Sequence, residues 1–340
     1  MSLSPVYINS IGLISPQPTA EGDFRFNRFR EGETRLRCIE PDYKKLINPV
    51  QLRRMSRILK LGLGATQICL NNAENTSPDA ILVGTGLACV NELEIFLQSV
   101  LDGNEQSLSP IPFINSSHNT VAAQISRMLK TQSYNNTYCH RGSSFESALI
   151  DAMMLINKQE ATNALLGGID EISGHYLSLL AGIGETTVAG EGAGFFVLSA
   201  KPDVNTYACI KAVKTFYLPG AFFENITGSI TTFLSDNHLS PDSIDALVLG
   251  LNGNPEDDRI YHYLTENVFP STSQLISYKH LCGEYMTAGS FALALAAHAI
   301  REGNFPGSCI LNKEVSKKPE RVLIFNHYRQ QNYSLVLLGK

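Results

Sequence analysis

Short runs of apolar residues, separated by longer stretches of helical character, constrain the fold of this 340-residue chain more than any other feature. The apolar runs fall at residues 6–11, 80–83, 164–166, 194–198, 246–249, 309–311 and 335–338. Several are almost wholly apolar, which is typical of strands buried on both faces. Helices are predicted at residues 52–72, 144–156 and 288–301. The alternation predicts an α/β protein with helices packed against buried sheets.

The second half of the chain repeats the pattern of the first half in a weak form. Four pairs of strings match: PDAILVGTG (78–86) with SIDALVLGLNG (243–253), AGFFVLSA (193–200) with YSLVLLGK (333–340), SSFESALIDAMMLI (143–156) with GSFALALAAHAI (289–300), and VYINSIGL (6–13) with CIKAVKTF (209–216). Chance reuse of α/β strings is the alternative to a true duplication. No Pro-, Gly- or Ser-rich linker separates the halves, so we predict two related halves, residues 1–205 and 206–340, in one continuous unit.

Charge, hydropathy and cysteine spacing argue against several classes of protein. The net charge of -5 gives no electrostatic case for binding nucleic acid. No apolar run reaches the roughly 18 residues of a membrane-spanning helix, and we expect no secretory signal. The seven cysteines form no CxxC pair, so neither a disulfide framework nor a structural zinc site is predicted. We expect reduced thiols and a cytoplasmic location.

Cys139 is the residue with the clearest candidate chemistry. It stands in NNTYCHRGSSFESALIDAMML (135–155), between a polar strand end and a long amphipathic helix. A thiol at the start of a helix faces unpaired backbone N–H groups and the positive end of the helix dipole, which both stabilise the nucleophilic thiolate. His140 and Arg141 are further sources of positive charge. A buried structural cysteine is the alternative, and position alone favours it.

Seven strings along the chain share a pattern with one family. They are VYINSIGLISP, ILVGTGLACVNELE, NTVAAQIS, TYCHRGSSFESAL, LLGGIDEIS, GEGAGFFVLS and SYKHLCGEYMTAGSFALALAAHAI. In this order they resemble the β-ketoacyl synthase family of the thiolase superfamily, and GEGAGFFVLS (190–199) is the most specific match. The resemblance implies a thiolase-like five-layered αβαβα sandwich built from two related halves. It also implies a dimer with active sites near the interface, close to residues 119–125.

The resemblance implies a mechanism as well. Cys139 would accept an acyl group from a thioester of acyl carrier protein or coenzyme A, while backbone N–H groups hold the oxyanion. A second acyl group would lose carbon dioxide, and its carbanion would attack the acyl-cysteine. We therefore expect these acyl thioesters as substrates, with no permanently bound cofactor and no metal.

The chain departs from the family pattern at three places in the expected site. Asn252 replaces the first family histidine, and Glu284 replaces the second, in a string that retains Lys279. An asparagine can still donate hydrogen bonds, but a glutamate would repel the enolate unless it is protonated or paired with Lys279. The family's glycine-rich C-terminal turn corresponds to residues 326–332, which contain no glycine. A loop there that needs positive φ would be strained, and His327 is either a substitute base or a histidine satisfied by its surroundings.

Two functions remain open. One is a divergent partner subunit, similar to the chain-length factors that pair with an active ketosynthase in polyketide-type pathways, with impaired decarboxylative condensation. The other is an acyltransferase that forms an acyl-Cys139 intermediate. Loss of both histidines favours the partner subunit, while retention of the cysteine favours the enzyme. Expected partners are an acyl carrier protein and either a second copy or a histidine-bearing ketosynthase. The candidate catalytic residues are Cys139, Asn252, Lys279, Glu284 and His327.

Overall fold

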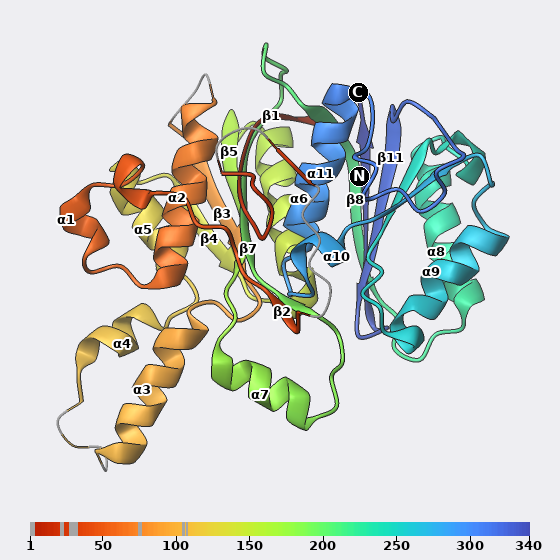
Figure 1. The fold of residues 1–340 in the computed structure, drawn as a ribbon. Helices are drawn as coiled ribbons and strands as arrows, with labels where there is room; N and C mark the ends of the chain where they lie inside the picture. The colour runs from red at the N-terminus through yellow and green to blue at the C-terminus, as the bar shows by residue number, and fades with distance from the viewer. Residues whose placement is uncertain (1–3, 21–23, 27–32, 74–76, 104–105, 107) are drawn as a thin grey trace.

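The computed structural model describes residues 4–20, 24–26, 33–73, 77–103, 106 and 108–340 (Figure 1). Most strands belong to two sets, one from each half of the chain. The first set is β1 (Val6–Ile14), β3 (Ala80–Gly84), β4 (Tyr134–Tyr138), β5 (Asn163–Asp170) and β7 (Gly192–Ser199). The second set is β8 (Ala208–Tyr217), β9 (Ala246–Leu249), β10 (Gln274–Ser277), β11 (Arg321–Tyr328) and β12 (Asn332–Gly339).

The two sets of strands have the same topology. The hydrogen-bonded order is β10-β9-β11-β12-β8-β1-β7-β5-β3-β4, and antiparallel pairing of β1 with β8 joins the two five-stranded sheets. Within each sheet, numbered by chain order, the strands run third, second, fourth, fifth, first. The matching strings of the sequence repeat fall on equivalent elements, so the two related halves are confirmed. The division at residue 205 lies between β7 and β8, and its role as a domain boundary stays a prediction.

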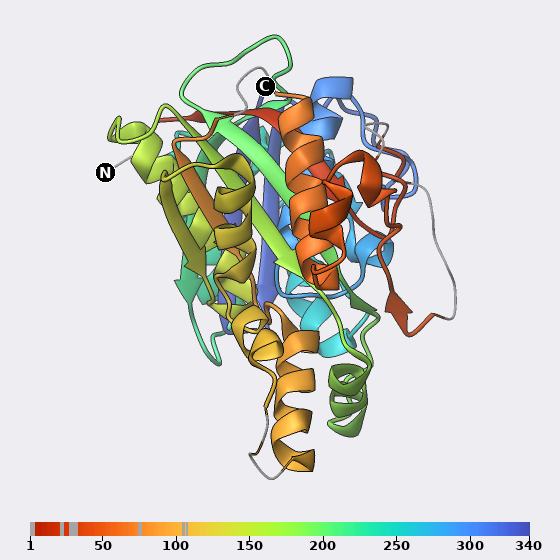
Figure 2. The ribbon, with the colours of Figure 1, turned by 90° about the vertical axis from the view of Figure 1, so that its left-hand side faces the viewer.

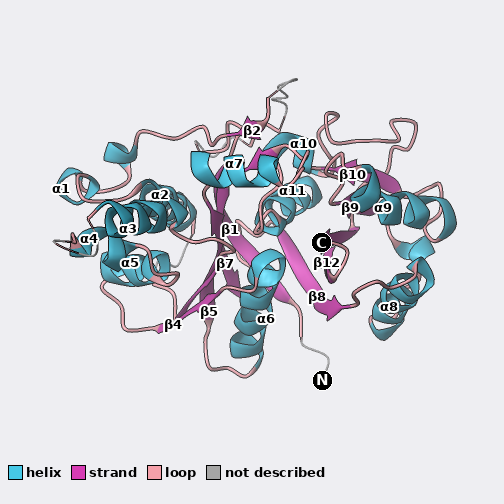
Figure 3. Cartoon of the chain, turned by 90° about the horizontal axis from the view of Figure 1, so that it is seen from below, coloured by secondary structure: helices cyan, strands magenta, loops and turns pink. Residues whose placement is uncertain are grey.

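Helices form three layers around the two sheets (Figure 3). The helices α6 (Ser144–Asn157) and α11 (Gly289–Glu302) lie between the two sheets. The outer face of the first sheet is covered by α2 (Arg57–Asn71) and α5 (Thr120–Leu129). The outer face of the second sheet is covered by α8 (Phe223–Asp236) and α9 (Pro255–Asn267). Nearly every side chain of the alanine-rich α11 is buried, as the sequence predicts for a helix packed on all sides. The expected five-layered αβαβα sandwich is confirmed.

The remaining elements are short or project from the sandwich. They are β2 (Arg35–Leu36), β6 (Ala189–Gly190), the 3₁₀ helices η1 (Tyr43–Lys45), η2 (Arg141–Ser143) and η3 (Pro241–Ser243), and the helices α1 (Pro49–Leu52), α3 (Val90–Asp102), α4 (Pro110–Asn115), α7 (Gly174–Gly182) and α10 (Lys279–Cys282). Figures 1 and 2 show α3 and α4 projecting together from one end of the molecule.

Two sequence-based element predictions are corrected by the structure. The helix predicted at 52–72 begins only at Arg57, because Pro49 starts the separate short helix α1, which Asn48 caps. Residues 309–311 form no strand and contribute a single bridge, between Ile310 and Ile276 of β10. The Leu275 N–H donates to the side chain of Asn312. This bond takes the place of the backbone hydrogen bond that would continue a strand ladder.

Candidate functional site

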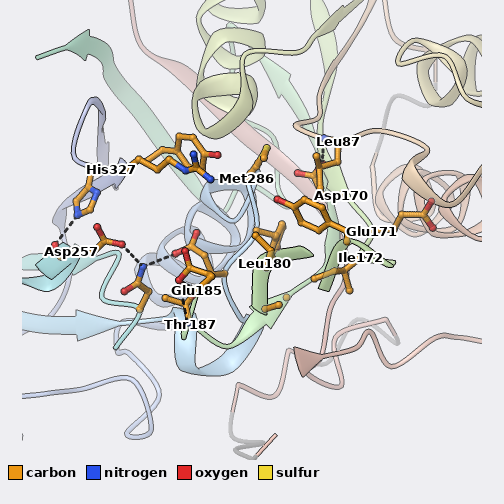
Figure 4. Close-up of a pocket in the computed structure, with 18 residues that line it drawn as sticks. Leu87, Asp170, Glu171, Ile172, Leu180, Glu185, Thr187, Asp257, Met286 and His327 are labelled. Carbon is orange, nitrogen blue, oxygen red and sulfur yellow. Dashed lines mark hydrogen bonds between the residues drawn. The ribbon is translucent and has the colours of Figure 1, made fainter. Parts of the chain in front are cut away.

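A cavity of about 90 Å³ lies between the two halves, where parallel strands of both sheets end. Its lining includes Leu87 after β3 and Asp170 at the end of β5, together with Asn252 after β9 and His327 near the end of β11. Figure 4 shows His327 and Asp257 on one side of the cavity, and Leu87 and Asp170 on the other. Because ligands of α/β proteins bind outside the carboxyl ends of the strands, this cavity is the candidate site.

Three of the sequence-predicted residues meet in one polar cluster at the cavity. The buried ammonium of Lys279 lies 2.6 Å from a carboxylate oxygen of Glu284. The Asn252 amide donates to that same oxygen at 3.1 Å and to the carboxylate of Asp257 at 3.2 Å. An amide has two N–H donors, and both are used here. Glu284 is therefore paired with Lys279, and neither Asn252 nor Glu284 presents a free hydrogen-bond donor to a ligand.

The loop that carries Glu284 is held by a close approach of two backbones. A Cβ on Gly190 would lie 2.1 Å from the Cys282 carbonyl oxygen, so only glycine fits there. The Gly190 N–H donates to the Glu284 carbonyl, and the Glu284 N–H donates to the Val188 carbonyl. The GEGAG string, which stood out in the sequence, thus positions the polar cluster from the other half of the molecule.

His327 is a neutral histidine whose hydrogen bonds are satisfied. Its Nε2 donates to the Asp257 carbonyl at 2.9 Å, while its Nδ1 accepts from the Gln330 N–H at 3.4 Å. The ring stacks on Tyr261, with centroids 5.0 Å apart. Burial, reinforced by the charge of Lys279, lowers the pKa of His327 to about 4. Of the two roles that the sequence left open, these contacts favour the satisfied histidine.

The C-terminal turn is shorter than the sequence suggested. Strand β11 continues through Tyr328 and pairs with β12, so the loop predicted at 326–332 shrinks to residues 329–331. Arg329 and Gln330 have φ of 52° and 50°, in the left-handed region that favours glycine. The strain expected from the missing glycines is thus present, at about 1 kcal/mol for each residue.

Cys139 does not stand at the start of a helix, so that prediction is wrong. The 3₁₀ helix η2 intervenes, and α6 begins at Ser144. The Cys139 thiol is exposed and donates to the Gly86 carbonyl at 3.7 Å. Burial of part of the side chain and the charge of Asp170 raise its pKa, contrary to the expected stabilisation of the thiolate. Cys139 lies beside the cavity, and the described residues that line it do not include this cysteine.

The 3₁₀ helix η2, directly before α6, contains Gly142, a residue that the sequence analysis did not single out. Gly142 is buried in η2, and a Cβ there would lie 2.3 Å from the Cβ of Tyr328, which lines the cavity. Residue 142 therefore has no room for a side chain against Tyr328. The signal in the sequence was a glycine directly before the SSF string that opens α6.

Asp170 is a second residue that the sequence reading missed. It is buried, and burial raises the pKa of its carboxyl. It accepts hydrogen bonds from the Thr85 hydroxyl, from the Gly86 and Leu87 N–H groups, and from the N–H and hydroxyl of Thr287. These bonds tie the end of β3 to the second half of the chain. An acid that ends an apolar strand, as in LLGGIDEIS, was the available signal.

Comparison with known proteins finds a family match for residues 36–180, which precede the residues of the polar cluster in the chain. Residues 36–180 match the family model of the beta-ketoacyl synthase N-terminal domain. The matched segment is similar to that family over 145 of the 340 residues. The resemblance expected from the ordered strings is confirmed, and the matched segment includes Cys139, Gly142 and Asp170. No curated protein matches the sequence.

Solved structures share the fold of this chain over nearly its whole length. The ishigamide ketosynthase/chain length factor has a TM-score of 0.78 and 15% identity, covering 99% of each chain. A beta-ketoacyl synthase from Burkholderia phymatum STM815 has a TM-score of 0.74 and 15% identity, covering 100% of each. A ketosynthase in complex with its chain length factor from Xenorhabdus doucetiae has a TM-score of 0.75 and 16% identity, covering 99% of this chain and 98% of that chain. At such identities the shared property is the thiolase-like fold.

The described part of the chain contains neither a cluster of metal ligands nor a helix that could span a membrane. Among the described residues, no group of His, Cys, Asp and Glu side chains is arranged to hold a metal ion. Within the same part of the chain, every helix is too short or too polar to cross a bilayer.

Proposed function

We propose that this chain is a partner subunit of an active ketosynthase, of the chain-length-factor type, and does not itself catalyse decarboxylative condensation. One observation carries the proposal: the polar cluster has no imidazole to donate to a thioester or an enolate. Asn252 and Glu284 stand in place of the family histidines, and both are bonded within the cluster. Loss of a single such donor typically slows a reaction about 100-fold or more.

The 3₁₀ helix η2, directly before α6, supports the same proposal. Its Gly142 has no side chain that could act as a nucleophile, and Tyr328 of the cavity wall leaves no room for one. Two of the similar structures carry "chain length factor" in their descriptions, and one of those describes it in complex with a ketosynthase.

The partners and substrates follow from this assignment. We propose a heterodimer with a histidine-bearing ketosynthase, acting on acyl thioesters of acyl carrier protein or coenzyme A. A structure with the same fold, at a TM-score of 0.75 and 13% identity, is described as a type II acyl-carrier protein in complex with its ketosynthase. All seven cysteines are free thiols, which supports a cytoplasmic location.

The second candidate is an acyltransferase that uses Cys139. Its thiol is exposed, and it contacts Gly86, the neighbour of Leu87 in the cavity wall. Against this candidate, the Cys139 pKa is raised and its S–H donates to a carbonyl, and both keep the sulfur in the less nucleophilic thiol form.

The test is to co-express the chain with a ketosynthase from the same genome that has both family histidines. We expect the pair to form an elongated acyl product, Cys139→Ala in this chain to leave the rate unchanged, and loss of the partner's nucleophile to abolish product. Intact-mass spectra after incubation with acyl-coenzyme A or acyl carrier protein should show no adduct on this chain. An acyl adduct that disappears in Cys139→Ala would establish the acyltransferase instead.

A further inference from the structure

A second cavity, of about 480 Å³, lies where two neighbouring strands of the second sheet end. Leu251 after β9 and Ser277 at the end of β10 both line it, and these two strands are parallel. The chain continues from β9 to α9 on the outer face of the sheet, and from β10 to α10 and then α11 between the sheets (Figure 3). At such a reversal a parallel sheet leaves a crevice outside its carboxyl ends, where α/β proteins bind ligands.

The lining of this second cavity combines apolar and polar side chains. Leu36 and Val188 come from the first half of the chain, and Leu251 and Leu311 from the second. The charged side chains include Asp258, Lys279 and Glu284. An apolar wall with a few polar groups, in a volume of about 300 to 1,000 Å³, is typical of sites that bind small molecules.

The polar cluster separates the second cavity from the candidate site. Asn252 and Glu284 line both of them. Lys279 lines the second cavity, whereas Asp257 and His327 line the candidate site. A molecule in the second cavity would therefore contact the polar cluster from the side opposite to the candidate site.

The ammonium of Lys279 has hydrogen-bond donors to spare. It carries three N–H groups, and its side chain is only 2% exposed. One N–H donates to Oε2 of Glu284, and no other residue in the described part of the chain accepts from this nitrogen. Because buried donors in proteins nearly always have acceptors, the spare donors indicate an oxygen supplied by a ligand.

Glu284 provides an acceptor next to these donors. Its Oε2 accepts from both Lys279 and Asn252, while its Oε1 accepts from no described residue. The nearby carboxylate of Asp258 is occupied by the N–H groups of Asn252 and Gly253.

These charges restrict the head group of the ligand. A cationic head would meet the ammonium, and an anionic head would meet two carboxylates, so each would be opposed by a like charge. An uncharged amide has both an acceptor oxygen and N–H donors, so it can accept from Lys279 and donate to Glu284 at the same time.

We propose that the second cavity binds a small uncharged molecule with an amide head and an aliphatic body. The amide oxygen would accept from Lys279, and the amide N–H would donate to Oε1 of Glu284. The aliphatic body would contact Leu36, Val188, Leu251 and Leu311. This site does not depend on the partner role, and either proposal can fail without the other.

The test compares three probes that share one aliphatic body: hexanamide, hexylamine and hexanoate. Binding is followed by the ring signals of His262 and His280, which line the cavity, in spectra of ¹³C-labelled protein, with His262→Gln to assign them. We expect hexanamide to shift these signals in a saturable way, and to bind at least tenfold more tightly than the two charged probes.

A variant that fills the cavity locates the bound probe. Leu311 is 51% exposed, so Leu311→Trp adds volume at the rim without overpacking the core. Val204→Trp, at a residue 87% exposed in the loop between β7 and β8, is the matched control. We expect Leu311→Trp to weaken hexanamide binding at least tenfold and Val204→Trp to leave it unchanged.

Several results would overturn the proposal. Tighter binding of hexylamine or hexanoate would assign a charged ligand, and equal binding of all three probes would show that the head group is not recognised. Without a saturable shift from hexanamide, the cavity is not an amide site. Unchanged binding in Leu311→Trp would place the probe elsewhere in the molecule.

Discussion

The ammonium nitrogen of Lys279 lies 2.6 Å from a carboxylate oxygen of Glu284, and the two partners differ sharply in burial, with side chains 2% and 26% exposed. The sequence resemblance places Glu284 where a condensing enzyme would have a histidine that donates hydrogen bonds. One charge is buried and the other reaches solvent. Substituting Glu284 and substituting Lys279 should therefore change the free energy of unfolding by different amounts.

Glu284→Gln is therefore expected to destabilise the fold by about 3 kcal/mol, since it leaves the buried Lys279 ammonium without its closest counter-charge. Lys279→Met is expected to cost less, because the remaining carboxylate still contacts water. The double variant should recover most of the loss. Urea unfolding at pH 7.5 measures all three free energies, and equal costs for the two single variants would contradict this account.

Glu146 on α6 is expected to make stability depend on pH. Its carboxyl is buried, one oxygen accepts from Ser334 and the other has no hydrogen-bond partner among the described residues. Burial raises its pKa from 4.5 to about 7. Between pH 4.5 and about pH 7 the folded chain keeps this carboxyl protonated, while the unfolded chain releases the proton. The contribution of the bound proton to the free energy of unfolding therefore falls as pH rises and is lost above about pH 7.

Glu146→Gln should remove that dependence. The free energy of unfolding of the variant, minus that of the wild type, is expected to rise by about 2 kcal/mol as the pH rises from 5 to 8. Other groups, including His327, contribute equally to both proteins and cancel in the difference. A difference that stays constant across this range would show that Glu146 ionises as it does in the unfolded chain.

His327 should remain neutral throughout the physiological range. With a pKa lowered to about 4, its ring is expected to keep the Nε2–H tautomer from pH 8 down to pH 5. Spectra of ¹⁵N-labelled histidine, with His327→Gln to assign the signal, measure this directly. Titration of that signal near pH 6.5, the value of an ordinary histidine, would restore His327 as a candidate base.

Gly142→Ala should be destabilising by about 2 kcal/mol, because its Cβ would meet Tyr328. Tyr328→Gly removes the obstructing atoms, so the two substitutions should couple. In a double-mutant cycle, Gly142→Ala is expected to cost at least 1 kcal/mol less in the Tyr328→Gly background. Additive costs would mean that the alanine is accommodated by movement elsewhere.

Cys139 should react with iodoacetamide as an ordinary exposed thiol with a raised pKa. Native protein is expected to be alkylated mainly at Cys139, since most of the other cysteines are buried, and the rate should still be rising at pH 9. Peptide mass spectra at a series of pH values provide the measurement. A rate that levels off near pH 7 would indicate a stabilised thiolate.

Apolar patterning was enough to predict an α/β protein with buried strands, while the five-layered sandwich followed from the family resemblance. Residues 80–83 and 246–249 are apolar throughout, and each lies within a strand buried on both faces. The same local reasoning failed at residues 309–311, which form a single bridge to β10 before the Asn312 side chain takes the Leu275 N–H. It failed also at 326–328, which continue β11 because β12 lies beside them. Strand pairing of this kind is decided by neighbours that are remote in the chain.

The sequence by itself determined the strands, the duplication and the residue types available to the site, because these depend on composition and on spacing along the chain. Only the tertiary structure decided which of those residues meet. Gly142 packs against Tyr328 only when the two halves close on each other, and Asn252 meets Glu284 only when two loops of the second half pack together. For that reason the sequence motif alone did not show that Cys139 lies beside the cavity, while Gly142, in the 3₁₀ helix before α6, packs against its wall.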